Sequence, residues 1–350
     1  MTQPFGVYIH IPFCARRCDY CAFATWTDRH HLQHAYLAAL RADVVRSVAQ
    51  PATSIFVGGG TPTLVDPVAL GAVIAAVPRT DDAEVTVECN PDDVTDDLLS
   101  AYVAAGVNRV SIGVQSMVPD VLEALGRWHA PDNVERAVAA VHRSALRTWN
   151  VDLIYGGAGE TVSQWEHTVR TAIALDPPHV SAYALTVEAG TPLAGQPERH
   201  PDDDDLADKY ELADDLLTAA GRANYEVSNW SVPGHESQHN RLYWLQGNYL
   251  GFGSAAHSHR DGRRWWNVRT PERYIAAVES GGPTEASGET LDAATRRDEG
   301  LQLALRMREG VAVDDLDIDG LDDLVVVEGQ RVTLTRRGRL LANEVSLRLR

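Results

Sequence analysis

The sequence YIHIPFCARRCDYC, residues 8–21, joins a short apolar run to a loop that carries three of the chain's four cysteines. The apolar run at residues 7–11 has the length and composition of a buried strand. Cys14, Cys18 and Cys21 follow it in a C-x3-C-x2-C spacing. Three thiolates on one loop can hold three corners of a [4Fe–4S] cluster and leave the fourth iron open, whereas a structural zinc ion takes a fourth ligand. The pattern favours the cluster; the alternative is a Cys3His zinc knuckle that uses His10 or a later histidine.

This strand begins a regular alternation along the chain. Apolar, strand-like runs recur at residues 54–57, 85–88, 109–113, 148–154 and 180–185, and helical patterns separate them at residues 32–48, 68–77, 94–105, 118–125, 134–145 and 162–175. Six consecutive βα units with buried strands predict an α/β fold, a parallel sheet curled into a partial (βα)6 TIM-like barrel. In such a barrel the functional site lies at the carboxyl ends of the strands.

The alternation weakens after residue 190, so we expect the barrel to occupy residues 1–197 and a smaller α+β region to occupy residues 198–350. The acidic run at 202–205 suits the N-terminus of a helix at 206–220, because carboxylates favour the positive end of the helix dipole. Residues 225–266 are rich in aromatic residues and histidine. A helix, a β pair and a closing helix within residues 290–350 predict a winged-helix-like module.

Composition restricts the function further. The 350 residues carry a formal charge of -18, which argues against a protein that grips nucleic acid phosphates. Lys209 is the single lysine and lies in an acidic stretch, so a Walker phosphate loop, a protein kinase and a Schiff-base enzyme are all disfavoured. The sequence contains no apolar run long enough to span a membrane and no secretory leader, and we therefore expect a cytoplasmic protein without a membrane segment.

The cysteine motif and several later blocks together resemble the radical S-adenosylmethionine (SAM) superfamily. The similarity is strongest to the branch that contains oxygen-independent coproporphyrinogen III dehydrogenase and the haem chaperone HemW. The resembling blocks follow one another in order: GGGTPT at 58–63, Glu88 with Asn90 and Pro91, GVQS at 113–116, DLIYG at 152–156, and GFG at 251–253 through His257. The resemblance covers essentially the whole chain and is strongest over residues 6–190.

The resemblance implies a [4Fe–4S] cluster on Cys14, Cys18 and Cys21, with SAM bound beside it. It assigns contacts with SAM to Tyr8, Tyr20, Gly59, Gly60, Thr61, Glu88, Gln115, Arg127 and Asp152. Residue types alone leave alternatives open: an acid that caps a helix for Glu88 or Asp152, and an ordinary surface arginine for Arg127. Cys89 receives no role and is expected to be a packed free thiol.

Two departures from the dehydrogenase favour the chaperone side of the branch. Phe23 stands where the dehydrogenase has a further cysteine, and only seven residues precede Tyr8. The sequence His239-Asn-Arg-Leu-Tyr243 matches an H-N-x-x-Y motif that the resemblance associates with haem, with His239 as the iron ligand; His257 and His259 are further candidates. The G-x-G-x-x-A match at 251–256 does not open a βαβ unit, which argues against dinucleotide binding.

The resemblance therefore implies a haem chaperone, which binds haem and passes it to haem-requiring proteins. Whether the chain is also an enzyme stays open. The alternative is a SAM-cleaving coproporphyrinogen III dehydrogenase of porphyrin biosynthesis. A third class, an iron–sulfur or zinc protein of purely structural function, would not bind SAM. The expected partners are haem and its acceptor proteins but not nucleic acid, and the chain could form a homodimer.

Overall fold

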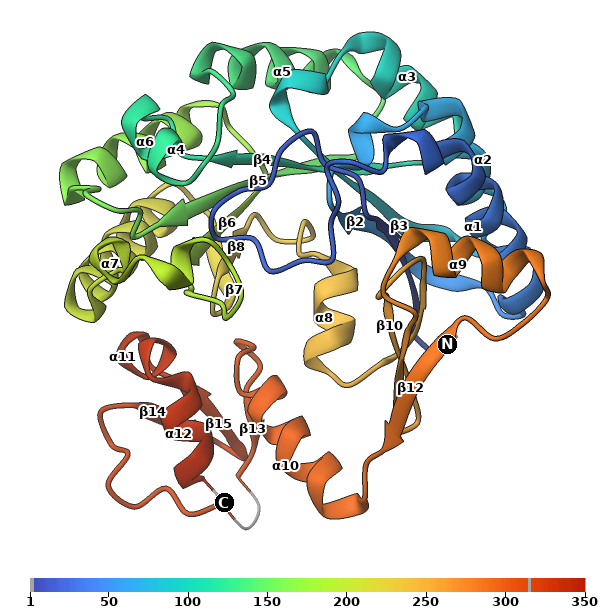
Figure 1. Ribbon diagram of the computed structural model, residues 1–350. Coiled ribbons are helices and arrows are strands. Elements are labelled where there is room, and N and C mark those ends of the chain that lie inside the picture. The colour runs from blue at the N-terminus through green and yellow to red at the C-terminus, as the bar shows by residue number, and fades with distance from the viewer. Residues whose placement is uncertain (1–2, 314–315, 350) are drawn as a thin grey trace.

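Six parallel strands form the centre of the protein, as the computed structural model of residues 3–313 and 316–349 shows (Figure 1). They are β1 (Phe5–Ile11), β2 (Ala52–Gly59), β3 (Arg79–Cys89), β4 (Arg109–Gln115), β5 (Thr148–Tyr155) and β6 (His179–Ala184), paired in this order. Most residues of these strands are buried on both faces, which explains why the strands appear in the sequence as nearly continuous apolar runs; the first four residues of β3 are the exception. The predicted α/β fold with a partial (βα)6 barrel is confirmed.

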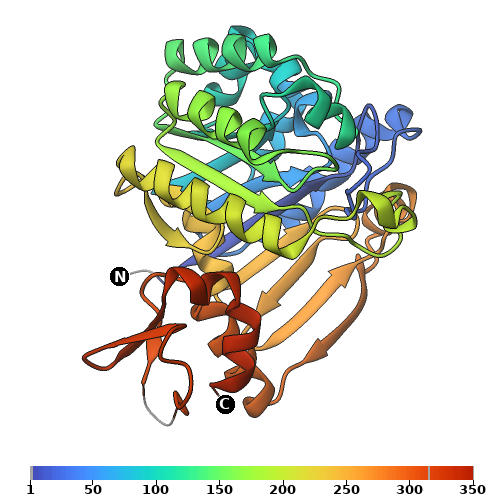
Figure 2. The same cartoon turned by 90° about the vertical axis from the view of Figure 1, so that its left-hand side faces the viewer.

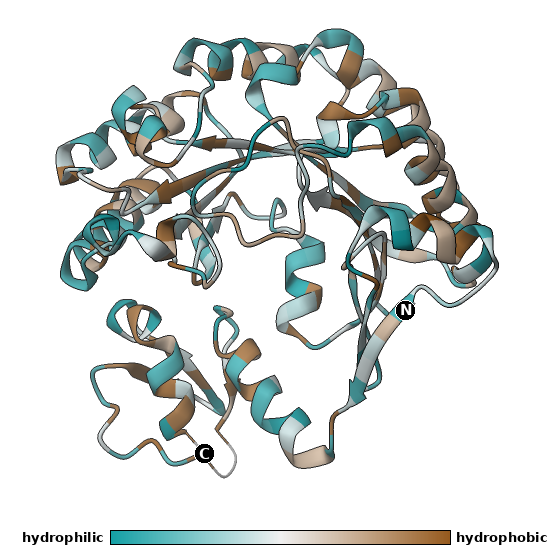
Figure 3. Ribbon diagram, viewed as in Figure 1, coloured by the Kyte–Doolittle hydropathy of each residue, from teal (hydrophilic) through white to brown (hydrophobic). Residues whose placement is uncertain are grey.

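The connecting helices cover the convex face of the curved sheet (Figure 1), and most of them combine hydrophilic with hydrophobic residues (Figure 3). They are α1 (Gln33–Ser47), α2 (Pro67–Ala75), α3 (Asp96–Ala104), α4 (Pro119–Ala124), α5 (Pro131–Arg143) and α6 (Val162–Ala174), followed by α7 (Asp203–Ala219). Asp202 caps α7 by accepting hydrogen bonds from the amides of Asp204 and Asp205, as the acidic run predicts. Within the described residues, no helix combines the length and apolar character needed to cross a bilayer.

Later strands extend the same sheet at both edges. At one edge β8 (Asn229–Ser231) pairs with β6, and β7 (Ala223–Glu226) pairs with β8. At the other edge β9 (Asn248–Phe252) lies parallel to β1, followed by the antiparallel strands β10 (His257–Arg260), β11 (Arg263–Asn267) and β12 (Glu285–Thr290). Helix α8 (Gln238–Trp244) packs inside the arc against β1 and β2, and α9 (Pro271–Glu279) packs on α1.

The C-terminal residues form a separate small module with its own core (Figure 2). Helix α10 (Ala293–Ala304) leads into a three-stranded sheet of β13 (Val311–Ala312), β14 (Val325–Glu328) and β15 (Arg331–Leu334), and then into α11 (Arg336–Leu340) and α12 (Ala342–Arg348). The β14–β15 pair matches the predicted one. The boundary near residue 197 stays a prediction, because strands that follow it continue the barrel sheet.

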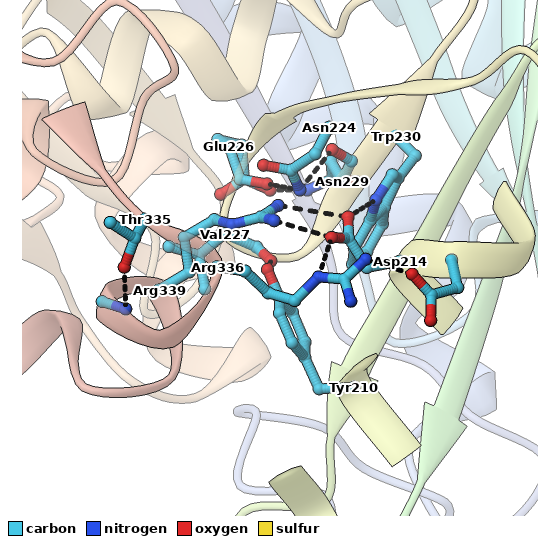
Figure 4. A network of polar contacts seen from close by, with 12 residues as sticks. Tyr210, Asp214, Asn224, Glu226, Val227, Asn229, Trp230, Thr335, Arg336 and Arg339 are labelled. Carbon is cyan, nitrogen blue, oxygen red and sulfur yellow. Dashed lines mark hydrogen bonds and ion pairs between the residues drawn. The ribbon is translucent and has the colours of Figure 1, made fainter. Parts of the chain in front are cut away.

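One buried carboxylate joins this module to the barrel (Figure 4). Asp214 on α7 accepts hydrogen bonds from both terminal nitrogens of Arg339, at 2.7 and 3.2 Å, and from Nε of Arg336 at 2.8 Å. Trp230 Nε1 donates a further bond of 2.7 Å to it. Only 6% of the Asp214 side chain is exposed, so these donors replace the water that the carboxylate loses.

The single lysine, Lys209, forms buried polar contacts that stabilise the fold. The Lys209 side chain is fully buried, and its ammonium lies 3.5 Å from the Glu160 carboxylate and 2.5 Å from that of Asp205. It also donates to the Glu160 carbonyl at 2.7 Å. This lysine therefore connects α7 to the loop that precedes α6.

We expect Asp214→Asn to loosen the C-terminal module. The substitution leaves Arg339 without its buried counterion, which should lower the free energy of unfolding by about 3 kcal/mol. Asp215→Asn is the matched control, because Asp215 is exposed and, among the residues that the structure describes, forms an ion pair with Arg336 alone; its loss should cost at most about 1 kcal/mol. Urea unfolding measures both; equal effects would contradict a special role for Asp214.

Candidate iron–sulfur and cofactor site

The loop that carries the three cysteines follows β1 directly and crosses the open side of the arc (Figure 1). Its two ends are tied together, because Cys14 N donates to Trp26 O at 3.1 Å and Trp26 N donates to Pro12 O at 2.7 Å. Cys21 N donates to Cys18 O at 3.2 Å, which makes a tight turn between these two cysteines. Cys14 is buried, while Cys18 and Cys21 are partly exposed, and all three are free thiols.

Neighbouring elements supply hydrogen bonds to these sulfur atoms. Thr61, just after β2, donates to Cys14 Sγ at 3.7 Å, and Arg127 donates to Cys18 Sγ at 3.8 Å. Gly60 lies so close that a Cβ there would stand 3.0 Å from Cys14 Sγ. Burial and the nearby Cys21 and Cys18 outweigh the Thr61 hydrogen bond and raise the pKa of Cys14 to about 11, so the site favours the thiolate only when a metal compensates.

This arrangement fits a cubane cluster better than a zinc ion. The residues described by the structure include no group of three histidine, cysteine or acidic side chains placed to hold one metal ion, whereas a cubane takes each thiolate on a different iron. His10 is also engaged, since its Nε2 lies 2.9 Å from Ala24 O and its Nδ1 lies 3.0 Å from the Tyr8 hydroxyl. Hydrogen bonds to the sulfurs, as from Thr61 and Arg127, are typical of iron–sulfur sites.

A cavity of about 220 Å³, here called the inner cavity, lies inside the barrel. Four residues expected to contact SAM line it: Tyr8, Gly59, Glu88 and Asp152. Polar groups that the sequence analysis missed also line it: Arg109, Ser111, Asn150, Ser181 and Tyr183. Their sequence signal was a polar residue inside an apolar strand, which marks a side chain that faces the interior of a barrel.

Glu88 is fixed by the strand next to it. Its carboxylate accepts a hydrogen bond of 3.0 Å from the Gly59 amide, and a Cβ at Gly58 would collide with it at 2.6 Å. Burial, and then the nearby carboxylate of Asp152, raise the pKa of Glu88 to about 7. Near neutral pH the Glu88 carboxyl can therefore lose its proton when a cation binds beside it.

Asp152 is better compensated. It accepts hydrogen bonds from Ser111 Oγ at 2.7 Å and from Asn150 Nδ2 at 2.8 Å. Burial still raises its pKa above the ordinary value. Asp152 and Glu88 both lie within strands and neither caps a helix, so that alternative is wrong.

Gln115 and Arg127 both lie beside Gly113, near the carboxyl end of β4. Gln115 has φ +62°, a left-handed conformation that is uncommon outside glycine and marks a constrained position. Arg127 donates to Gly113 O at 2.9 Å as well as to Cys18, so it is not an ordinary surface arginine. Tyr20 lies on the cysteine loop and packs against the apolar cluster around Leu125. Their contacts with SAM stay predictions.

His239 lies on α8 with both ring nitrogens engaged. Nδ1 is 2.9 Å from Ser54 Oγ, Nε2 is 2.8 Å from the Tyr243 hydroxyl, and the ring stacks on Phe56 at 5.4 Å. The side chain is fully buried, which lowers its pKa to about 3. His239 as a haem ligand stays a prediction, and ligation through either ring nitrogen would require the hydrogen bond at that nitrogen to break.

A wider cavity of about 850 Å³, here called the outer cavity, lies between the cysteine loop, α8, α9, α10 and one face of the β9–β12 extension. Phe23 lies at the rim of the outer cavity with 62% of its surface exposed. Tyr8 and Tyr243 line both cavities and lie between them. Tyr249, His257 and Trp266 line the strand side. Its size suits a ligand larger than an amino acid.

Comparison with known proteins agrees with this geometry. The Radical SAM superfamily model matches residues 8–172. The chain is 40% identical to the heme chaperone HemW of Mycobacterium tuberculosis over 98% of this chain and 94% of that protein, and 32% identical to HemW of Bacillus subtilis over 97% of each. This chain belongs to the HemW family of radical SAM proteins. The HemW-family chain also has the fold of coproporphyrinogen III oxidase (HemN) from Escherichia coli, with a TM-score of 0.83 and 21% identity over 99% of this chain and 90% of that one.

The three cysteines of this HemW-family chain should be separable from the fourth. Replacing any of Cys14, Cys18 or Cys21 with alanine should abolish retention of about four iron and four sulfide per chain after anaerobic reconstitution. Cys89→Ala is the control, because the buried Cys89 thiol belongs to the hydrophobic core and donates a hydrogen bond to Val87 O at 3.6 Å. Iron and acid-labile sulfide analysis measures the result; an unchanged cluster in Cys18→Ala would contradict the assignment.

The protonation of Glu88 should control SAM affinity. The ionised carboxylate can accept a hydrogen bond from the SAM amino group, so affinity should rise by up to about tenfold between pH 6 and pH 8 as the proton is lost. Glu88→Gln should bind SAM more weakly, and its affinity should lack this part of the pH dependence. Isothermal titration of the reconstituted protein measures both; identical pH profiles would show that Glu88 does not govern binding.

Proposed function

We propose that this protein binds haem and transfers it to haem-requiring proteins. The observation that carries the proposal is the outer cavity, an aromatic and histidine-lined space that opens beside the cysteine loop. The names of the relatives that the chain matches over nearly its whole length support it. Phe23 at the rim supports it too, because an exposed aromatic ring can pack on a flat macrocycle.

The cysteine loop and the inner cavity give the chain a second capability. Cys14, Cys18 and Cys21 would hold a [4Fe–4S] cluster, and an iron left open on that cluster supplies one-electron chemistry to SAM. The chain's own part is to hold SAM. Gly59 lines the inner cavity without a side chain, and Glu88 and Asp152 offer buried carboxylates to the cationic groups of SAM.

The inner and outer cavities adjoin at Tyr8 and Tyr243, so a ligand in one lies next to the other. This proximity allows the cluster and SAM to influence loading or release of haem. It would equally suit a coproporphyrinogen III dehydrogenase, in which the substrate must reach SAM. The two functions differ in whether a porphyrinogen is consumed.

The acceptor would be a protein that lacks its haem. A cytoplasmic location and a homodimer accompany this proposal as predictions, and size-exclusion chromatography of reconstituted and apo protein tests the latter.

Haem titration into the reconstituted protein should give a Soret band that saturates at about one haem per chain, since a cavity of this size holds a single cofactor. The loaded protein should then transfer haem to an apo-haem protein, measured by the acceptor's spectrum. No haem uptake would overturn the proposal. Consumption of coproporphyrinogen III with SAM under reducing, anaerobic conditions would establish the dehydrogenase instead.

A further inference from the structure

The strand side of the outer cavity presents one histidine whose ring is free. His257 on β10 is exposed, and its imidazole makes no hydrogen bond within residues 3–313 and 316–349. The two other histidines that line the cavity are engaged: His10 with Ala24 and Tyr8, and His259 with Gly247 O at 3.0 Å and Gly262 N at 3.2 Å. Only His257 among these three offers a ring nitrogen to a ligand without breaking a hydrogen bond.

The strand pairing holds this ring in a defined orientation. His257 lies directly opposite Trp266 on β11, and their rings stack with a centroid separation of 5.6 Å and an interplanar angle of 29°. The side chain is thus supported from one side by an indole. Because both residues lie on regular strands, the imidazole is placed more precisely than it would be on a loop.

Cationic groups surround the same cavity. Arg264 lines it and pairs with Glu289 at 2.7 Å and Glu299 at 2.9 Å. Arg269 and Arg273 also line it, are exposed, and form no ion pair within the described part of the chain. In a chain of formal charge -18, two free guanidinium groups at one cavity are a local reversal of charge that suits an anionic ligand.

The walls of the outer cavity carry several aromatic side chains. Tyr243, Tyr249 and Trp266 line its walls, and Phe23 stands at its rim. A planar, apolar macrocycle with acidic side arms matches these walls and the two free arginines together. A phosphate ester or a peptide would match the arginines but leave the aromatic walls and the free imidazole without a function.

We propose that His257 is the axial iron ligand of haem bound in the outer cavity, with Arg269 and Arg273 pairing with its propionates. This inference rests on the proposed haem-binding function and names its site. His239, which the H-N-x-x-Y motif suggests, instead holds α8 against β2 through its hydrogen bond with Ser54 and its stacking on Phe56.

The electrostatics agree with this assignment. Partial burial and the charge of Arg264 lower the pKa of His257 below the ordinary value. The imidazole is therefore neutral at physiological pH and has an electron pair for iron.

The test compares histidine variants in the reconstituted, full-length protein titrated with ferric haem. His257→Gly should weaken haem binding by about 10- to 100-fold or more, since loss of even an outer-shell partner of a metal ligand costs that much, and should remove the nitrogen-ligand signature from the absorption and electron paramagnetic resonance spectra. Added imidazole should restore that signature. His31→Ala is the matched control, because His31 is an exposed histidine outside the cavity and should bind haem as the unmodified protein does.

A second pair of variants tests the propionate contacts. Arg269→Gln combined with Arg273→Gln should lower affinity for haem while keeping the nitrogen-ligand spectrum. The same substitutions should affect a haem dimethyl ester little, because the ester has no carboxylates to pair.

The outcomes separate this inference from the proposed function. No haem uptake by the unmodified protein would defeat the function itself. Normal uptake with an unchanged spectrum in His257→Gly would overturn the inference and leave the function intact. If His239→Ala, but not His257→Gly, lost the nitrogen-ligand signature while circular dichroism showed a folded chain, the ligand would be His239.

Discussion

The close approach of the segment after β2 to the segment after β1 fixes the position of the cysteine loop. Gly60 N donates to Ile11 O at 2.7 Å, and Thr61 N donates to Phe13 O at 2.8 Å, so parallel pairing continues past the end of β1. A Cβ at Gly60 would stand 2.7 Å from Phe13 O and 2.8 Å from Ile11 O. Because Gly60 has no side chain, the two segments can approach this closely, and Cys14 lies beside Thr61 at the start of the cysteine loop.

Most of the barrel could be predicted from the sequence because its strands are buried on both faces and its helices are amphipathic. The antiparallel strands β10, β11 and β12, which extend the sheet at one edge, could not be predicted in this way. Strand β12 reads EASGET and is exposed along its whole length, so it carries no apolar pattern, and its pairing with β11 is set by tertiary context. Strands β10 and β11 are rich in histidine, arginine and tryptophan, which gives no clear strand signal.

The candidate site likewise has a part that could be predicted from the sequence and a part that could not. The cysteine motif is local, so its spacing could be read directly. The environment of His239 depends on Ser54 and Phe56, which lie far away in the sequence, and only the fold shows that both its nitrogens are engaged. The outer cavity likewise forms from the cysteine loop, three helices and a sheet extension, and no one of these segments carries a sequence pattern that predicts the cavity.

Strand β1 has hydrogen-bonding partners on both sides, β2 and β9, that lie at opposite ends of the barrel in sequence. During synthesis its β9-facing edge stays open until Phe252 has left the ribosome, on the order of 10 to 50 s after Phe5 at about 5–20 residues per second. For that interval the nascent chain displays an unpaired strand edge directly before its cysteines. Closure by β9 is thus a late assembly step, and chaperones that shield strand edges would act on this chain before its barrel is complete.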